Sequence, residues 1–448
     1  MEARTVGIRV LMLPWLAHGH ISAFLELAKR LTEKNFFIYF CSTSINLNSV
    51  KKMLPEKYYP SIQLVELHLP SSPELPPHLH TTNGLPPNLM PILKIAFEES
   101  KPFFCQILNA LNPDQIMYDF NEPWVSASAS LLNIPSILFI PFGSLCTSFI
   151  LHLMENPDAD YPFQSIQLHE SEKTNFRAML ESSANGVKDA DRVREAFKLS
   201  RDVVLIKTST EIEGKYIDYL SMLVKKKVLP VGPLVQEMVD KDEDTHEVMQ
   251  FLHKKDESSV VFVSFGSEYF LSREEREEIA YGLELSRVSF IWVVRFPAGD
   301  KTTIEEALPA GFLDNVADLG MIVEGWAPQA KILMHSSTGG FISHCGWNSV
   351  LESIKFGVPI IAMPVHLDQP LNARLVEEVG VGLEVKRDET GRLDRKEIAR
   401  VVRRIVMEEH GMKVRNKARE LSEKMAMKEA EELDEVVKEM VQLSGKRK

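Results

Sequence analysis

Residues 339–352 read GGFISHCGWNSVLE, and this stretch decides the fold. Two glycines lead into a short apolar run, Gly346 can turn the chain, and a helical pattern begins near Asn348. A strand, a turn and a helix in this order form the repeating unit of α/β proteins, in which helices cover both faces of a parallel sheet. Ligands bind beyond the carboxyl ends of such strands, where a helix start offers free N–H groups to a phosphate.

The same unit recurs along the chain. Residues 8–14 (IRVLMLP) predict a buried strand, and residues 21–31 follow with apolar side chains on one helical face. The alternation stops at residues 225–257, which contain two prolines and the acidic run DKDEDTHE, and it restarts at residues 260–265. We therefore predict two successive doubly wound halves, with the ligand site in the cleft between them.

The composition excludes several classes of protein. The chain has 448 residues, of which 44% are hydrophobic and 25% charged, as in soluble globular proteins. The net charge of −12 argues against nucleic acid as a partner. Four cysteines outside any CxxC pattern predict free thiols in a reducing compartment. The sequence contains no window of about 18 uninterrupted apolar residues, so we expect no membrane span. We expect a cytoplasmic protein.

Two polar side chains each follow a predicted strand. His20 comes after residues 8–14, and Asp119 comes after residues 115–118. A neutral imidazole suits a general base near pH 7, and it works better when an acceptor holds its other ring nitrogen. We interpret His20 as a base and Asp119 as its partner. The alternatives are that His20 caps or packs, that Asp119 caps the next helix, and that Glu122 is the partner carboxylate.

Side-chain donors gather at the predicted phosphate site. His344, Asn348 and Ser349 lie at the turn or in the first helical residues. Ser349 and Glu352 also have the spacing of a capping box, which alone would explain both. Capping does not explain His344.

Two further positions have both a functional and a structural interpretation. Asp368 and Gln369 follow an apolar run and can bind vicinal sugar hydroxyls, or they form a solvated turn before Pro370. Trp326 lies in a loop and can stack on a flat base, or it packs against the protein.

Several motifs are absent. Without GxGxxG after a strand, a nicotinamide or flavin site is disfavoured, and without GxxxxGK[ST] a P-loop enzyme is excluded. Neither HExxH nor paired CxxC motifs suggest zinc. The DxD triplets lie in polar acidic stretches, so we interpret them as solvated loops and expect no metal.

Residues 326–369 read WAPQAKILMHSSTGGFISHCGWNSVLESIKFGVPIIAMPVHLDQ, which closely resembles the signature box of plant family-1 UDP-sugar glycosyltransferases. The resemblance covers the whole chain, and segments such as HTTNGLPP and VFVSFGSEYFLS are similar to the clade that adds a sugar to a sugar. It implies a GT-B fold: two Rossmann-like doubly wound domains facing a central cleft, with a C-terminal helix crossing back to the N-terminal domain. The expected boundaries are 1–238 for the acceptor domain, 239–257 for a linker and acidic loop, 258–425 for the UDP-sugar domain and 426–448 for the helix.

The resemblance also implies roles for individual residues. Trp326 stacks on uracil while the Ala327 backbone reads the edge of the base. Gln329 and Glu352 bind the ribose. The diphosphate is bound by His344, Gly346, Asn348, Ser349 and Ser267. The transferred sugar is bound by Trp347, Asp368 and Gln369. His20 is the base and Asp119 its partner. The acceptor candidates are His80, Thr81, Phe120, Glu122, Trp124, Phe142 and Gly143, around the long loop at residues 69–91.

The expected activity is metal-independent, inverting transfer of glucose from UDP-glucose to a sugar hydroxyl of a plant glycoside, such as a triterpenoid, flavonoid or lignan glycoside. The alternatives are transfer to an aglycone hydroxyl and a non-catalytic nucleotide-sugar or glycoside binding protein. We expect a monomer that needs no cofactor beyond the UDP-glucose co-substrate. One departure is Ala23, where many members of the family have proline.

Overall fold

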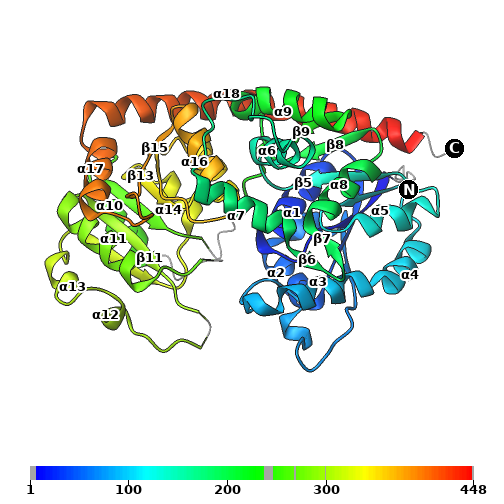
Figure 1. Cartoon of the computed structure of the whole chain (residues 1–448), viewed down its shortest axis with the longest axis horizontal. Coiled ribbons are helices and arrows are strands. Elements are labelled where there is room, and N and C mark those ends of the chain that lie inside the picture. Colours follow the sequence, from blue (N-terminus) through cyan, green and yellow to red (C-terminus); the bar gives the residue numbers. More distant parts are fainter. Residues whose placement is uncertain (1–6, 237–245, 267–268, 298, 446–448) are drawn as a thin grey trace. The chain divides into compact units, whose positions relative to one another are not determined.

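The computed structural model describes residues 7–236, 246–266, 269–297 and 299–445 (Figure 1). The chain forms two compact units. Unit 1 comprises residues 1–161, 173–236 and 427–448, and unit 2 comprises residues 162–172 and 237–426.

Unit 1 is built on a seven-stranded parallel sheet with the order β3-β2-β1-β4-β5-β8-β9. Its strands are β1 (Ile8–Leu13), β2 (Phe36–Ser42), β3 (Ile62–Glu66), β4 (Gln115–Tyr118), β5 (Ser136–Ile140), β8 (Val203–Ile206) and β9 (Lys227–Pro230). Its helices are α1 (His18–Thr32), α2 (Ser44–Met53), α3 (Met90–Glu99), α4 (Lys101–Leu111), α5 (Pro123–Ser130), α6 (Ser144–Glu155), α8 (Asp189–Leu199) and α9 (Thr210–Val224). The short antiparallel pair β6 (Ser183–Ala184) and β7 (Val187–Lys188) and the 3-10 turns η1 (Glu56–Tyr58), η2 (Pro77–Leu79) and η3 (Pro87–Leu89) complete it.

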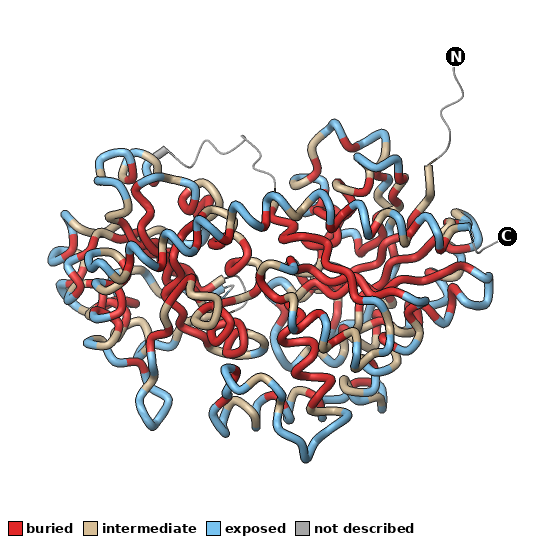
Figure 2. Tube along the Cα trace, turned by 90° about the horizontal axis from the view of Figure 1, so that it is seen from above, coloured by how far each residue is buried: buried red, intermediate tan, exposed pale blue. Residues whose placement is uncertain are grey.

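Both faces of this sheet are buried. Along β1, Leu11 and Leu13 belong to one apolar cluster, whereas Val10 and Met12 belong to a second cluster on the opposite face. Successive side chains of a strand point to opposite faces, so a strand covered on both sides must be apolar throughout. Figure 2 shows the buried residues concentrated along the strands and the exposed residues on the outer faces of the helices.

Unit 2 repeats the arrangement on a six-stranded parallel sheet with the order β12-β11-β10-β13-β14-β15. Its strands are β10 (Val260–Ser264), β11 (Ser289–Val294), β12 (Gly320–Glu324), β13 (Thr338–Ser343), β14 (Ile360–Ala362) and β15 (Gly382–Glu384). Its helices are α10 (His246–His253), α11 (Arg273–Ser286), α12 (Ile304–Ala307), α13 (Phe312–Asn315), α14 (Gln329–Met334), α15 (Trp347–Lys355), α16 (Gln369–Glu378) and α17 (Arg395–Val406).

Two segments differ from the predicted boundaries. The predicted linker at residues 239–257 includes α10, whose Val248 and Leu252 pack into the core of unit 2; residues 239–245 lie outside the described residues. Residues 162–172, which the sequence placed in the first domain, belong to unit 2, so that α7 (Glu170–Glu181) begins in unit 2 and continues in unit 1.

The last helix belongs to both units. Figure 1 shows α18 (Glu409–Gly445) as one continuous helix, coloured orange to red. Its residues from 427 onward belong to unit 1, as the resemblance implied for the C-terminal helix. Leu433, Val436 and Met440 join the second apolar cluster of unit 1. Glu432 accepts hydrogen bonds from Ser209 and Thr210 at the start of α9.

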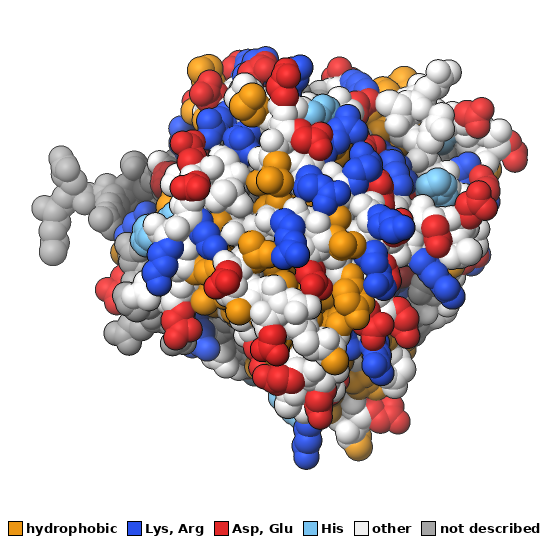
Figure 3. Space-filling view, turned by 90° about the vertical axis from the view of Figure 1, so that its left-hand side faces the viewer, with side chains coloured by type: hydrophobic (Ala, Val, Ile, Leu, Met, Phe, Trp, Pro, Cys, Tyr) orange, Lys and Arg blue, Asp and Glu red, His pale blue; other side chains and the backbone are white. Residues whose placement is uncertain are grey.

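The surface has no continuous basic field on the face drawn in Figure 3, where lysine and arginine side chains alternate with aspartate and glutamate. None of the helices in the described part of the chain is long and apolar enough to cross a bilayer.

Met440→Ala tests the contribution of α18 to unit 1. Met440 is fully buried, so removing its side chain should lower the free energy of unfolding by about 2–4 kcal/mol. Met427 lies on the same helix with 78% of its surface exposed, so Met427→Ala should change stability by less than about 0.5 kcal/mol. Urea unfolding of both variants measures the difference, and equal effects would show that the end of α18 adds no core to unit 1.

Candidate active site

The two catalytic candidates of unit 1, His20 and Asp119, lie where the strand order of the sheet reverses. The chain order runs outward from β1 in one direction and from β4 in the other, and such switch points are the usual ligand sites of doubly wound sheets. α1 begins at His18, directly after β1, and Asp119 follows β4. Because β1 and β4 are neighbours, the sheet brings His20 and Asp119 together.

The Asp119 carboxylate is fully buried and hydrogen-bonded. One oxygen accepts the backbone N–H of Trp15 at 3.2 Å and lies 2.7 Å from Nδ1 of His20. The other oxygen accepts the N–H of Phe120 at 2.8 Å. A carboxylate can only accept, so Nδ1 of a neutral His20 carries the proton and Nε2 carries the lone pair. The residue before α1 is Ala17, so His20 is not the helix cap.

Glu122 is not the partner of His20. It is fully buried, and neither carboxylate oxygen has a hydrogen-bond partner among the described residues. Burial, with a smaller contribution from the nearby Asp119 charge, raises the pKa of Glu122 well above its usual value. The structure therefore favours Asp119 over the competing carboxylate.

An aromatic pair lies beside His20. The Phe120 ring is 5.7 Å from the imidazole and 5.3 Å from the ring of Phe142, measured between centroids. Phe120 and Phe142 are half-buried. This edge of unit 1 can therefore offer an apolar contact close to the imidazole.

Glu213 fixes the segment that carries Phe142, and the sequence did not identify it. Its fully buried carboxylate accepts the N–H groups of Ser144 at 2.8 Å and Leu145 at 2.7 Å, at the start of α6. A Cβ atom on Gly143 would lie 2.8 Å from the same carboxylate, so only glycine fits there without a shift.

Three other acceptor candidates have structural contacts in the described part of the chain. His80 is buried with its ring 3.3 Å from the Leu75 carbonyl, and the Thr81 hydroxyl donates to the Leu16 carbonyl at 3.4 Å. Trp124 is buried in edge-to-face contact with Phe97 and Phe104. These contacts secure the loop at residues 69–91 and the core beneath it.

Unit 2 has a switch point between β10 and β13, and His344 follows β13. The imidazole lies against two glycines: a Cβ atom on Gly266 would be 2.6 Å from Nε2 of His344, and one on Gly346 would be 2.5 Å from it. Burial, with a smaller effect from His366, lowers the pKa of His344 to about 4. His344 is therefore neutral at pH 7 and can act there as a hydrogen-bond donor rather than as a cation.

α15 begins at Trp347, with Gly346 as its cap and no side-chain capping bond. The capping-box interpretation of Ser349 and Glu352 is therefore wrong, because Ser349 lies inside the first turn. Gln329, at the start of α14, instead donates to Glu352 at 2.6 Å and to Ser349 at 3.4 Å.

The remaining predicted donor residues differ in exposure. Trp326 follows β12 and is 64% exposed, so its indole face is open to a flat ligand, whereas Ala327 is buried. Gln369 is buried, and its amide oxygen accepts the N–H groups of Val365 and His366 at 3.0 and 3.1 Å. Gln369 is thus not a solvated turn residue. Ser267 lies outside the described residues.

Comparison with known proteins identifies the family of the chain. Residues 204–437 match the family described as UDP-glucoronosyl and UDP-glucosyl transferase, and residues 6–236 match a glycosyltransferase N-terminal domain. Mogroside IIIx synthase of Siraitia grosvenorii is 54% identical over 439 residues, which are 96% of this chain and 92% of that protein.

Two further proteins extend the comparison. β-D-glucosyl crocetin β-1,6-glucosyltransferase of Gardenia jasminoides is 52% identical over 96% of this chain and 98% of its own. A solved structure of Phytolacca americana UGT2 with UDP-2-fluoroglucose and pterostilbene has a TM-score of 0.78 at 28% identity, over 98% of this chain and 100% of that chain. The chain belongs to the UDP-glycosyltransferase family and has its GT-B fold.

Glu122→Gln tests the buried carboxyl. Because the pKa of Glu122 is raised, the folded protein keeps a proton on this carboxyl at pH values above 4.5, where the unfolded chain has released it. The free energy of unfolding therefore falls as pH rises above 4.5. We expect the free energy of unfolding to fall less with pH in Glu122→Gln than in the unmodified protein, by up to about 1.4 kcal/mol per pH unit.

Glu278 provides the control of opposite sign. Its hydrogen bonds to Arg395 lower its pKa, so its stabilising contribution is lost as pH falls and Glu278→Gln should remove that loss. Urea unfolding across pH 3–8 covers both effects, because the Glu278 contribution is lost below its ordinary pKa of 4.5 and the Glu122 contribution changes above that value. An unchanged pH dependence in Glu122→Gln would contradict this view of Glu122.

Gly346→Ala tests the packing of His344. Gly346 has a φ of −58°, which alanine tolerates, so the cost comes from the clash with the imidazole and should be about 1–3 kcal/mol in unfolding free energy. The penalty should largely vanish in a His344→Ala background, because the ring is then absent. A double-mutant cycle with strictly additive effects would show that the two residues do not press on one another.

Proposed function

We propose that this enzyme transfers glucose from UDP-glucose to a sugar hydroxyl of a plant glycoside and that it inverts the anomeric configuration. The observation that carries the catalytic part is the His20–Asp119 pair, with Nδ1 2.7 Å from a buried carboxylate. Nε2 of His20 removes the proton from the acceptor hydroxyl as its oxygen attacks the anomeric carbon. UDP leaves from the opposite face, so an α-linked donor gives a β-glycoside.

The donor half of the proposal rests on unit 2. The exposed Trp326 stacks on uracil, and Gln329 with Glu352 binds the ribose. His344 and the amide end of α15 receive the negative charge that develops on the diphosphate. These groups meet that charge by hydrogen bonding, and we therefore propose that the reaction needs no metal ion. Asp368 and Gln369 bind the glucose.

The acceptor class is supported by the relatives. Beta-D-glucosyl crocetin beta-1,6-glucosyltransferase is named for transfer to a compound that already carries glucose. In this chain, Phe120 and Phe142 supply an apolar wall beside His20 that suits the aglycone part of such a glycoside. Triterpenoid, flavonoid and lignan glycosides are the proposed classes. We also place the enzyme in the cytoplasm, which its four free cysteines support.

A panel of glycosides and their matched aglycones, each incubated with UDP-glucose, tests the proposal. We expect UDP release together with a product heavier by one hexosyl residue for glycosides. Transfer to aglycones alone would replace the sugar acceptor with the aglycone hydroxyl. The absence of UDP release with every acceptor would favour a binding protein over an enzyme.

Substitution of the two catalytic candidates tests the mechanism. His20→Ala should lower kcat by about 10²–10⁴-fold, because it removes the base. Asp119→Ala should lower kcat less, because orientation of the ring is partly recoverable. His68 is exposed, and His68→Ala should keep the normal rate. Rates are measured at saturating UDP-glucose, and near-normal rates in both test variants would remove the pair from the mechanism.

A further inference from the structure

Asn372 joins two parts of the donor half-site of unit 2. It lies in the first turn of α16 and is fully buried. Its side-chain nitrogen donates to the Cys345 carbonyl at 2.9 Å and to a carboxylate oxygen of Asp368 at 2.7 Å. Cys345 lies in the turn before α15, and Asp368 is the proposed sugar ligand. One amide group therefore contacts both the diphosphate turn and the carboxylate.

The orientation of this amide follows from its partners. A carbonyl oxygen and a carboxylate oxygen both accept, so the NH₂ group of Asn372 must face them. The amide oxygen of Asn372 is then buried, and it has no hydrogen-bond partner in the described part of the chain. An unpaired buried oxygen lowers stability, so packing alone does not account for asparagine at this position.

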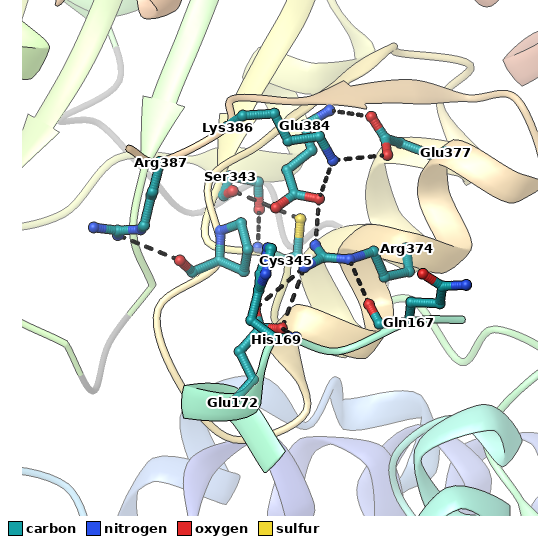
Figure 4. Close-up of polar contacts among 11 residues, drawn as sticks. Gln167, His169, Glu172, Ser343, Cys345, Arg374, Glu377, Glu384, Lys386 and Arg387 are labelled. Carbon is teal, nitrogen blue, oxygen red and sulfur yellow. Dashed lines mark hydrogen bonds and ion pairs between the residues drawn. The ribbon is translucent and has the colours of Figure 1, made fainter. Parts of the chain in front are cut away.

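The Cys345 peptide that Asn372 contacts is in an uncommon conformation. Cys345 has a φ of +63°, in the left-handed region that residues other than glycine rarely adopt. The Ser343 hydroxyl accepts a hydrogen bond from the Cys345 N–H at 3.1 Å (Figure 4). Thus Ser343 holds the N–H of this residue and Asn372 holds its carbonyl.

The direction of that carbonyl sets the direction of the next amide. A peptide group is planar and trans, so the N–H of Gly346 points opposite to the Cys345 carbonyl. Gly346 is the cap of α15, and its N–H is the first in the turn that opens this helix. Asn372 on one side of the peptide therefore aims the Gly346 N–H to the other side.

The helix that carries Asn372 is itself held in place. Two residues further along α16, Arg374 pairs with Glu384 and Glu172 and donates to the Gln167 carbonyl (Figure 4). Arg374 is buried, and so is Glu384. A side chain on an element fixed in this way can hold its partners in one geometry.

We propose that Asn372 is a positioning residue for the UDP-sugar. Its amide holds the Cys345 peptide and the Asp368 carboxylate in one arrangement, so that the diphosphate and the transferred sugar meet correctly directed partners. The inference rests on the proposed donor function of this half-site and assigns a residue beyond those that touch the donor.

Asn372→Ala and the nearly isosteric Asn372→Asp test the proposal by calorimetric titration with UDP and by steady-state kinetics. We expect Asn372→Ala to weaken UDP binding and to raise the KM for UDP-glucose, the latter by about tenfold, while the acceptor KM stays within about twofold. The loss should be larger for UDP-glucose than for UDP, because Asp368 is the proposed ligand of the sugar and not of the UDP part of the donor. Asn372→Asp should lose at least as much, because a carboxylate cannot donate to either partner.

Ser337→Ala is the matched control. Ser337 is buried and its hydroxyl lies within hydrogen-bond distance of the Leu252 and Lys255 carbonyls, at the amino end of β13 rather than at its carboxyl end. It should lower the unfolding temperature and leave UDP binding unchanged. Folded Asn372 variants with normal UDP affinity and normal donor KM would overturn the proposal, whatever their stability. If Asn372→Ala fails to fold, Asn372→Asp decides.

This test is separable from that of the proposed function. UDP binding needs no acceptor, so the comparison of the variants stands even if the unmodified enzyme transfers glucose to no glycoside. That outcome would contradict the proposed acceptor and leave the positioning role of Asn372 to be judged on UDP affinity.

Discussion

The burial of Asp119 is the constraint on which the catalytic half-site depends. A carboxylate without solvent contact is stable only when its oxygens are hydrogen-bonded. Asp119 finds these bonds at the backbone of Trp15 after β1, at the backbone of Phe120 after β4 and at the imidazole of His20. The interactions that satisfy the carboxylate therefore also tie two strand ends together and set the tautomer of His20. Orientation of the base follows from the stability of the fold.

Unit 2 positions its histidine by a different means. The His344 ring packs directly against the backbone of Gly266 and Gly346. A Cβ atom at either position would clash with the ring, so the two glycines leave the space that it occupies. Burial lowers the pKa of His344 and leaves the ring neutral at pH 7, so the half-site offers hydrogen-bond donors and a helix amide end rather than a fixed positive charge. Donors of this kind, directed before the reaction begins, stabilise a leaving diphosphate without reorganisation.

The sequence predicted the parts of the site that strand order determines. Two apolar runs followed by His20 and Asp119 were enough to place both at one edge of a sheet, and β1 and β4 are indeed neighbours. Glu213 was beyond sequence reasoning, because it resembles an ordinary acid in the first turn of a helix and its partner Ser144 lies 69 residues away. The acceptor role of His80 stays a prediction: the sequence offered it as an acceptor residue, and the structure places it buried against the Leu75 carbonyl of its own loop.

The protonation of His20 tests the central claim most directly. Nitrogen-15 NMR of the imidazole, at a pH where the ring is neutral, reports which nitrogen carries the proton. We predict the Nδ1–H tautomer in the unmodified protein and its loss in Asp119→Ala. A His20 ring that carries its proton on Nε2, or that exchanges equally between the two forms, would contradict the assignment of Asp119 as the group that prepares the base.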